Sequence, residues 1–411
     1  MTTFDALGLS PRVLKALTER GFDTPTPIQE QAIPVVLDDR DIMGLAQTGT
    51  GKTAAFGLPL IHKMLGFGVK PEPKTVRALI LAPTRELAKQ ISDELKLLVQ
   101  KTPLKIALVV RGGSLNAQAN RLQRGTDILV ATPGRLIDLM DRRALTLTKT
   151  GFLVLDEADQ MLDMGFIPAL RKIAALLPEA RQTLLFSATM PKQMAELSAT
   201  YLTDPVRIEV SPVGRAADKI AQTVHFVDQK AKTTLLKDLL AEHRAERALV
   251  FCRTKHGAER LMKQLVAADF AAASIHGNKS QGQRDRALKS FKAGKTTVLV
   301  ATDVAARGID VPGVRFVYNY ELPNVAENYV HRIGRTARAG ADGAAVALCA
   351  PHEMADLRAI EKAMKQAIPV AGGEPFAEQG ATAAKPGRKP GTRRRRPRRP
   401  GRGGKPSRIA A

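Results

Sequence analysis

The chain has 411 residues, 44% of them hydrophobic, and is therefore long enough for two domains with buried cores. No apolar run approaches the roughly 18 residues of a membrane-spanning helix, and the stretch MTTFDALGLSPRVLKAL lacks the features of a secretory signal. Two cysteines, Cys252 and Cys349, lie far apart in apolar stretches. This excludes a disulfide framework and zinc-ligand spacing, and it fits a reducing, cytoplasmic location without membrane attachment.

The formal net charge of +23 indicates a polyanionic partner, most often nucleic acid. The charge is uneven along the chain. Residues 385–411 contain twelve Lys and Arg and no Asp or Glu; the rest of the chain keeps 51 basic and 40 acidic residues, a net charge of +11. Both the body and the C-terminal segment are therefore expected to contact a polyanion.

Continuous apolar runs, which are typical of buried parallel strands, alternate with amphipathic segments along the whole chain. This alternation predicts an α/β fold with two tandem parallel-sheet domains that carry helices on both faces. LVATP at 129–133 and LVATD at 299–303 suggest that the two folds are related. The predicted strands lie in 78–83, 127–133, 152–159, 183–189, 248–254, 297–303, 316–323 and 344–350.

Two changes in composition predict the domain boundaries. Pro212 and Gly214 interrupt the alternation and indicate a linker. After about Ile368 the sequence becomes rich in Gly, Pro, Ala and Arg and cannot bury a core, so it is expected to be disordered. The predicted division is a first domain at 1–208, a linker at 209–219, a second domain at 220–370 and a disordered basic tail at 371–411.

A phosphate-binding loop is predicted at residues 46–53, AQTGTGKT, between an apolar stretch and a helix-like segment. Gly49 and Gly51 let the backbone turn its N–H groups toward phosphate oxygens. Lys52 is placed to reach the β- and γ-phosphates, and the hydroxyl of Thr53 is placed to bind Mg²⁺. The loop therefore predicts ATP or a related nucleotide, with Mg²⁺, as the cofactors.

The apolar run at 153–155 ends in three carboxylates within four positions, Asp156, Glu157 and Asp159. Buried carboxylates are costly unless they are paired or hold a metal, so a positive group is expected at this strand end. In a nucleotide hydrolase Asp156 would hold Mg²⁺, and Glu157 would orient or deprotonate the attacking water. Acidic residues beside a helix N-terminus would explain this motif alone. Together with the phosphate loop upstream, it favours the hydrolase.

Asp156-Glu157-Ala158-Asp159 is similar to the motif after which the DEAD-box RNA helicases are named, and the resemblance extends over residues 4–350. Within that family the chain most resembles the bacterial RhlE-type subgroup. The resemblance implies two RecA-like domains that bind ATP and RNA in the cleft between them. It also implies that closure of the cleft melts short RNA duplexes and that ATP hydrolysis reopens it.

The family motifs on the nucleotide side follow in order. GFDTPTPIQ at 21–29 resembles the Q motif, which implies that Gln29 reads the adenine edge and Phe22 packs on the ring. The resemblance assigns coupling of ATP state to closure to Asp159, Ser187, Thr189 and His331. It assigns nucleotide contacts to Phe4, Phe22, Gln29, Ala46, Gln47, Thr48, Gly49, Thr50, Gly51, Lys52, Thr53, Gly308 and Asp310.

The remaining motifs resemble those that contact RNA. Such residue types suit phosphates and riboses, and aromatic residues, the usual base-stacking platforms, make up only 4% of the chain. Recognition is therefore expected to be largely independent of RNA sequence and strongly salt-sensitive. The implied RNA contacts are Pro83, Thr84, Arg85, Gly112, Gly113, Thr132, Pro133, Gly134, Arg135, Thr254, Gln281, Arg284 and Thr302.

HRIGRTAR at 331–338 resembles the arginine-finger motif. Arg332 and Arg335 are three residues apart and would share a helix face, and a guanidinium binds phosphate oxygens bidentately. An arginine finger can contribute roughly 10³–10⁵ in rate. A finger in the second domain would make hydrolysis depend on closure. The expected catalytic residues are Lys52, Asp156, Glu157, Arg332 and Arg335, with Thr53 and Asp156 as the Mg²⁺ ligands.

Two other functions remain open. A non-catalytic RNA chaperone or clamp would use the same nucleotide-gated core, and a DNA helicase would respond to DNA. Intact Glu157, Arg332 and Arg335 argue against an inactive ATPase but do not separate unwinding from clamping. Ribosome assembly and RNA turnover both suit the resemblance, with ribosomal precursors or the RNA-decay machinery as partners.

The basic tail is expected to act as a flexible tether to RNA. Truncation after Ala384 removes its twelve positive charges. We predict weaker RNA binding, with a larger loss at low salt than at high salt because screening weakens charge attraction. Titration of a fluorescent single-stranded RNA at two salt concentrations measures this difference. Unchanged affinity at low salt would contradict the tether.

Overall fold

The computed structural model describes most of the chain up to Phe376. Residues up to Glu374 belong to one unit. The predicted linker from residue 211 onward, most of the predicted tail, and the candidate residues Gln47, Thr48 and Asp310 lie outside the described residues. The described residues are 2–46, 49–190, 192–210, 220–306, 308, 311, 313–337 and 342–376.

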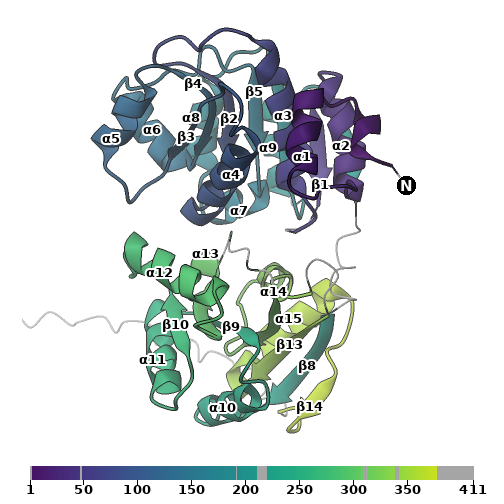
Figure 1. Ribbon diagram of the computed structural model, residues 1–411. Coiled ribbons are helices and arrows are strands. Elements are labelled where there is room, and N and C mark those ends of the chain that lie inside the picture. The colour runs from purple at the N-terminus through teal and green to yellow at the C-terminus, as the bar shows by residue number, and fades with distance from the viewer. Residues whose placement is uncertain are drawn as a thin grey trace, which may run out of the picture. The chain divides into compact units, whose positions relative to one another are not determined.

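The first sheet has seven strands in the order β3-β4-β2-β5-β6-β1-β7, and all its pairings are parallel (Figure 1). Its strands are β1 (Ile42–Leu45), β2 (Val76–Leu81), β3 (Ile106–Val109), β4 (Thr126–Ala131), β5 (Phe152–Leu155), β6 (Gln182–Ser187) and β7 (Val206–Glu209). The accompanying helices are η1 (Phe4–Leu7), α1 (Pro11–Thr18), α2 (Pro27–Leu37), α3 (Lys52–Gly66), α4 (Arg85–Leu98), α5 (Leu115–Leu122), α6 (Pro133–Asp141), α7 (Ala158–Asp163), α8 (Ile167–Ala174) and α9 (Lys192–Tyr201).

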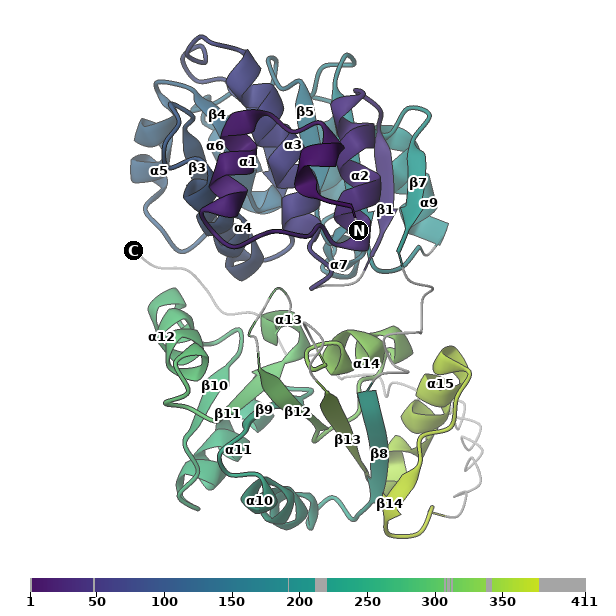
Figure 2. The ribbon, with the colours of Figure 1, turned by 45° about the vertical axis from the view of Figure 1, so that its right-hand side comes forward.

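The central strands of this sheet are buried on both faces, which explains their continuous apolar sequences. Along β2, Ala78 and Ile80 join the core beneath α1 to α4, whereas Leu79 and Leu81 join the core beneath α6, α8 and α9. Figure 2 shows α1, α3 and α4 on one face of the sheet. Each fully buried Ile or Leu side chain contributes about 1.5–3 kcal/mol, so the two cores fix the sheet firmly.

The second sheet also has seven parallel strands, in the order β10-β11-β9-β12-β13-β8-β14. Its strands are β8 (Ile220–Phe226), β9 (Arg247–Cys252), β10 (Ala272–Ile275), β11 (Val298–Thr302), β12 (Val314–Asn319), β13 (Gly343–Cys349) and β14 (Val370–Gly372). Its helices are α10 (Lys232–Glu242), α11 (Lys255–Val266), α12 (Gln281–Lys292), α13 (Asp303–Ala306), α14 (Ala326–Ile333), η3 (Pro351–Glu353) and α15 (Met354–Met364).

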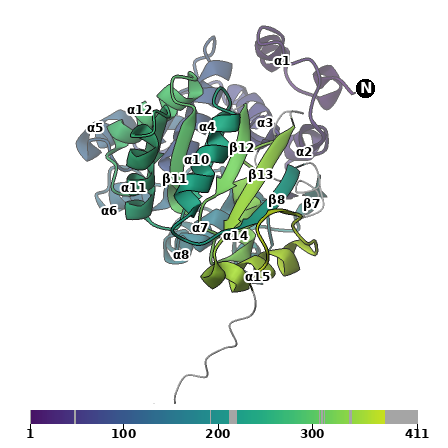
Figure 3. The same cartoon turned by 90° about the horizontal axis from the view of Figure 1, so that it is seen from below.

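The two sheets share one topology. The second order equals the first with each strand number raised by seven. LVATP begins inside β4 and LVATD begins inside β11, and both run past the strand end, so the two similar sequences occupy equivalent places. Figure 3 shows α10 and α11 over the strands of the second sheet, and residues of both helices join one core. The expectation of two tandem parallel-sheet domains with related folds is confirmed.

The segments predicted to carry chemistry follow the carboxyl ends of strands, which a parallel sheet collects at one edge. In the first sheet the phosphate loop follows β1 and the acidic motif follows β5. Residues 83–86, 111–113, 132–135 and 187–189 follow β2, β3, β4 and β6. No helix among the described residues is long and apolar enough to span a membrane.

A buried ion pair holds the second domain together. The side chains of Lys232 and Glu353 are 0% exposed and contact each other. Lys232 Nζ also donates to the backbone oxygens of Tyr320 (2.8 Å) and Leu348 (2.7 Å). Glu353 Oε1 accepts hydrogen bonds of 3.0 Å from Arg253 Nη2 and from the Leu322 backbone N–H. Burial lowers the pKa of Lys232, and Glu353 opposes this shift.

We predict that Glu353→Gln destabilises the protein by about 3–5 kcal/mol, because it leaves the Lys232 ammonium buried without its carboxylate. Urea unfolding monitored by circular dichroism measures the loss. Glu246→Gln is the matched control, because Glu246 pairs with Arg315 at the surface, where such pairs contribute about 0–1 kcal/mol. Equal stability of the two variants would contradict the importance of the buried pair.

Candidate nucleotide and nucleic-acid sites

The phosphate loop turns directly into helix α3. Gly49 and Gly51 have φ angles of 88° and 91°, in the left-handed region that glycine adopts without strain. A Cβ at Gly51 would lie 2.5 Å from Gln29 Nε2, so the position also lacks room for a side chain. The first N–H groups of α3 have no partner within the helix and point toward its N-terminus, where the helix dipole favours an anion. This geometry suits a phosphate group.

Lys52 and Asp156 bring the loop and the acidic motif together. Lys52 Nζ donates to the Ala46 carbonyl (3.2 Å) and lies 3.7 Å from Asp156 Oδ1, and both side chains are buried. Burial raises the pKa of Asp156 to about 6, although the charge of Lys52 lowers it. A further positive charge at this point would favour the ionised carboxylate. The positive group expected at this strand end is therefore Lys52, and the site suits a cation beside it.

The next acidic residues have separate positions. Glu157 is buried at the start of α7 with φ of 51°, a conformation that costs roughly 1–3 kcal/mol and is often found at functional sites. Asp159 Oδ2 accepts hydrogen bonds from Ala188 N (3.0 Å), Thr189 N (3.0 Å) and Thr189 Oγ1 (3.1 Å). Ser187 Oγ donates to the Thr189 carbonyl (2.7 Å). Three of the four residues expected to couple ATP state to closure thus form one network.

The segment expected to bind adenine contacts the phosphate loop. Gln29 accepts a hydrogen bond from Thr26 N (3.0 Å), and its Nε2 donates to the Gly51 carbonyl (3.1 Å). The Phe22 side chain is 55% exposed and could pack on a flat ligand. Phe4 is different: it is buried in the core with Leu7. In this structure Phe4 therefore acts as a core residue, and its contact with the nucleotide stays a prediction.

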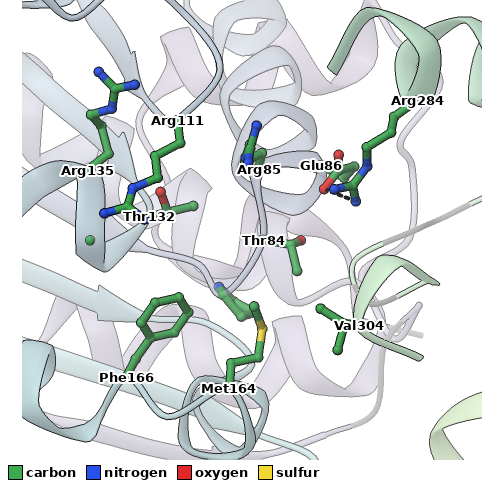
Figure 4. Close-up of a pocket in the computed structure, with 12 residues that line it drawn as sticks. Thr84, Arg85, Glu86, Arg111, Thr132, Arg135, Met164, Phe166, Arg284 and Val304 are labelled. Carbon is green, nitrogen blue, oxygen red and sulfur yellow. Dashed lines mark ion pairs between the residues drawn. The ribbon is translucent and has the colours of Figure 1, made fainter. Parts of the chain in front are cut away.

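A groove of about 280 Å³ lies beside the starts of α4 and α6 (Figure 4). Seven residues predicted to contact RNA line it, and five lining residues were not predicted. The predicted ones are Pro83, Thr84, Arg85, Thr132, Gly134, Arg135 and Arg284; the others are Glu86, Arg111, Met164, Phe166 and Val304.

Arg135 gives this groove its clearest sign of an anionic ligand. The side chain is 8% exposed, and its Nη2 donates to the Gly113 carbonyl (3.2 Å). Within the described part of the chain, its Nε and Nη1 have no hydrogen-bond partner. Buried donors without partners are costly, and a guanidinium binds phosphate oxygens in pairs. The arrangement is therefore suited to a phosphate of a nucleic-acid backbone.

Glu86 connects other predicted RNA contacts to one another. Its carboxylate lies 3.0 Å from Arg284 Nη2 and accepts a hydrogen bond of 3.1 Å from Gln281 Nε2. Gln281 Oε1 accepts a hydrogen bond from Arg85 Nη1 (3.1 Å). These cationic and amide groups are therefore already engaged with protein groups in this structure.

The remaining predicted contacts lie elsewhere. Gly112 is in the left-handed region at φ of 96°, where a Cβ would lie 2.7 Å from Arg85 Nη1. Pro133 starts α6, Thr254 caps α11 by accepting from Gly257 N (3.0 Å), and Thr302 ends β11. Gly308, expected at the nucleotide, instead lies against Thr84, whose Oγ1 would be 2.4 Å from an added Cβ. Its small size therefore serves close backbone approach at that point.

Comparison with known proteins identifies the family. The family model for DEAD/DEAH box helicases matches residues 26–197, and the one for the helicase conserved C-terminal domain matches residues 231–340. The ATP-dependent RNA helicase CshA of Listeria monocytogenes is 44% identical over 89% of this chain and 69% of its own length. The DEAD-box ATP-dependent RNA helicase CshA of Bacillus subtilis is 43% identical over 89% and 73%.

The chain belongs to the DEAD-box helicase family. The relatives just described are CshA proteins, so they do not support the RhlE-type subgroup that the motifs suggested. Solved structures agree with the fold. S. cerevisiae Dbp5 bound to RNA and ADP BeF3 has a TM-score of 0.81 at 32% identity, over 90% of this chain and 96% of that one. Mss116p bound to ssRNA and AMP-PNP has a TM-score of 0.82 at 30% identity, over 91% and 80%.

The two arginines expected as fingers, Arg332 and Arg335, differ in their hydrogen-bond partners in this DEAD-box helicase. Arg332 is 1% exposed, and its Nε and Nη2 bind both carboxylate oxygens of Asp303 (2.5 and 2.7 Å). Its Nη1 donates to Asn319 Oδ1 (3.0 Å) and to the Glu321 carbonyl (2.6 Å). With all three nitrogens engaged inside its own domain, Arg332 is placed to support the structure. Its role as a finger stays a prediction, since it would require the guanidinium to exchange these partners for phosphate oxygens.

Arg335 remains the better candidate of the two. Its Nε donates to the carbonyl of His331 (3.2 Å), and both residues line a small cavity that also includes Arg332 and Asp303. His331 therefore lies with the arginines and apart from the Asp159 network. Arg338, the last arginine of the motif, lies outside the described residues.

We predict that Arg332→Ala lowers the free energy of unfolding by at least about 2 kcal/mol, because it breaks a buried ion pair. The loss should stay below that of a fully buried pair, since the Asp303 side chain is partly exposed and water can solvate its carboxylate. Arg335→Ala should lower the kcat for ATP by roughly 10³-fold or more with a smaller loss of stability. Urea unfolding and steady-state ATP hydrolysis, measured on both variants, separate these effects. Wild-type stability of the Arg332→Ala protein together with lost turnover would support Arg332 as a finger.

Proposed function

We propose that this DEAD-box helicase couples ATP hydrolysis to closure of its two domains and to local, sequence-independent unwinding of RNA duplexes. One observation carries the proposal: the phosphate loop and the groove with the unpartnered Arg135 donors lie at the same edge of the first sheet. The Asp159 network joins the acidic motif to the loop after β6. A change at the nucleotide site therefore has a short physical path into the domain that carries the groove.

The residues of the phosphate loop fit a triphosphate with Mg²⁺. Thr53 and Asp156 would hold the ion, because hydroxyl and carboxylate oxygens are ligands that Mg²⁺ prefers. Among the described residues, no three His, Cys, Asp or Glu side chains gather into a metal site. This fits an ion that takes most of its ligands from phosphates and water. When bound, Mg²⁺ would neutralise charge on the β- and γ-phosphates.

The protein groups would then divide the remaining work. Lys52 would bind the β- and γ-phosphates beside the N-terminus of α3, and Phe22 with Gln29 would hold the adenine. Glu157 would orient the attacking water or accept its proton. Arg335 would stabilise the charge of the transferring phosphoryl group after closure. Because the finger comes from the second domain, turnover would be slow until RNA favours the closed state.

RNA would lie in the groove on its backbone. Donors for phosphates and riboses are offered by Arg135, Thr84 and Thr132. Such contacts do not depend on the base sequence. Solved structures of Dbp5 and Mss116p with RNA support this ligand for the present chain. We further propose a cytoplasmic role in ribosome assembly or RNA turnover, on ribosomal precursors or with the RNA-decay machinery. The RhlE-type subgroup stays a prediction.

Steady-state ATP hydrolysis with and without single-stranded RNA tests the proposal. We predict strong stimulation by RNA and little by DNA of the same sequence, because closure around RNA completes the catalytic site. Glu157→Gln should bind ATP normally but lose turnover, and Lys52→Ala should bind ATP more weakly. Native turnover in Glu157→Gln would contradict the role of that residue.

The same experiment separates the other functions. Equal hydrolysis with and without RNA would leave an ATPase without a helicase. Equal stimulation by RNA and DNA would favour the DNA helicase. RNA-stimulated hydrolysis without release of a labelled strand from a short duplex would favour the clamp.

A further inference from the structure

We propose that Arg111 and Phe166 together bind one nucleotide of the RNA strand, Arg111 through its phosphate and Phe166 through the face of its base. This inference rests on the proposed function, because it assigns two more contacts in the same groove. It also departs from the expectation that the groove offers only backbone contacts. Both side chains come from the first domain and line the groove.

Arg111 is a cation that the structure leaves available. It follows β3, its side chain is 62% exposed, and its contact within the described residues is a 3.7 Å approach to Asp138. Surface pairs of this length contribute little and do not hold a guanidinium in place. The guanidinium lies against the backbone at the start of α6, where a Cβ at Gly134 would be 3.5 Å from Nη2.

Three independent features favour a phosphate at this point. The N-terminus of α6, a helix of nine residues, presents unpaired N–H groups and the positive end of its dipole. Arg135, in the first turn of the same helix, is buried with two nitrogens that lack partners among the described residues. Arg111 adds a second guanidinium from a different strand end. A phosphate bound here would satisfy all three.

Phe166 forms the apolar part of the groove. It lies between α7 and α8, is only partly buried, and lines the groove together with Met164 and Val304. Figure 4 shows the Phe166 ring and the Arg111 guanidinium on the same side of the groove, away from Arg284 and Val304. A nucleotide has a charged end and a flat apolar face, so a cation and an aromatic ring in this arrangement suit it.

Phe166 also contributes to packing, and an experiment must separate this contribution from stacking on a base. Its ring packs partly against the core under α8, and its backbone oxygen accepts from Leu170 N (2.8 Å). Replacement by Ala could therefore loosen the start of α8, whereas Leu preserves apolar bulk without a flat ring. Comparison of the two variants separates stacking from packing.

The experiment measures binding of a fluorescent single-stranded oligouridine to the full chain, with a non-hydrolysable ATP analogue, over a series of salt concentrations. A second oligonucleotide has the same ribose-phosphate backbone but no bases at internal positions. The variants are Arg111→Ala, Phe166→Ala and Phe166→Leu. The controls are Arg124→Ala, an exposed arginine just before β4 at the opposite edge of the sheet, and Phe67→Ala, an exposed phenylalanine after α3.

We expect Arg111→Ala to weaken binding and to reduce the slope of log Kd against log salt by about 0.7, the value for one phosphate on a single strand. Phe166→Ala should weaken binding roughly 5- to 100-fold with an unchanged slope, and Phe166→Leu should recover only part of this loss. On the oligonucleotide without bases, the Phe166 variants should bind like the wild type. Both controls should keep wild-type affinity.

Three results would overturn the inference. One is an unchanged salt slope for Arg111→Ala. Another is an equal loss for Phe166→Ala on both oligonucleotides, which would assign Phe166 to packing. The third is wild-type affinity for Phe166→Leu. If Arg135→Ala weakens binding while these variants do not, only this inference fails; if the wild type does not bind RNA, the proposed function fails with it.

Discussion

The function of this DEAD-box helicase depends on one constraint of backbone geometry: a parallel sheet collects the carboxyl ends of its strands at a single edge. The helices that follow begin there, so their unpaired N–H groups and positive dipole ends lie at that edge too. In the first sheet this brings together the phosphate loop after β1, the acidic motif after β5 and the groove beside β2, β3 and β4. Segments more than a hundred residues apart in sequence, such as the phosphate loop and the acidic motif, thereby lie side by side, with Lys52 Nζ 3.7 Å from Asp156 Oδ1.

The sequence predicted what repeated apolar runs and short motifs encode. Most central strands could be predicted because both their faces are buried and their apolar runs are continuous. The edge strands β3, β7, β10 and β14 were not predicted, because runs of three or four residues are too short to give a clear period. Strand β8 was not predicted because it lacks a continuous apolar run. The phosphate loop and the acidic motif could each be predicted from local spacing, whereas the contact of Lys52 with Asp156 depends on the fold. The burial of Phe4 and the ion pair of Arg332 could not be predicted, since they depend on residues distant in sequence such as Asp303.

Arg111 and Phe166 are two groove residues that the sequence did not predict. Arg111 directly precedes Gly112, and Phe166 lies seven residues beyond Asp159, so both stood next to recognised motifs. Neither has a spacing that would predict a ligand. Their placement in one groove results from the order of β3, β4 and β5 in the sheet and from the turn between α7 and α8. Only the three-dimensional arrangement could connect them.

The two sheets have the same strand order, but the segments that follow equivalent strands have different roles. The phosphate loop follows β1, whereas the equivalent strand β8 leads to α10, whose first residue Lys232 is buried against Glu353. A lysine at a helix start thus lies in the proposed phosphate site in one domain and in a buried ion pair in the other. A rigid second domain is useful for a finger, because Arg335 can complete the site only if its own domain keeps it in place. The engaged guanidinium of Arg332, three residues earlier in the last turn of α14, supplies that support. In our proposal the motif therefore combines an arginine that holds the structure with one that acts on phosphate.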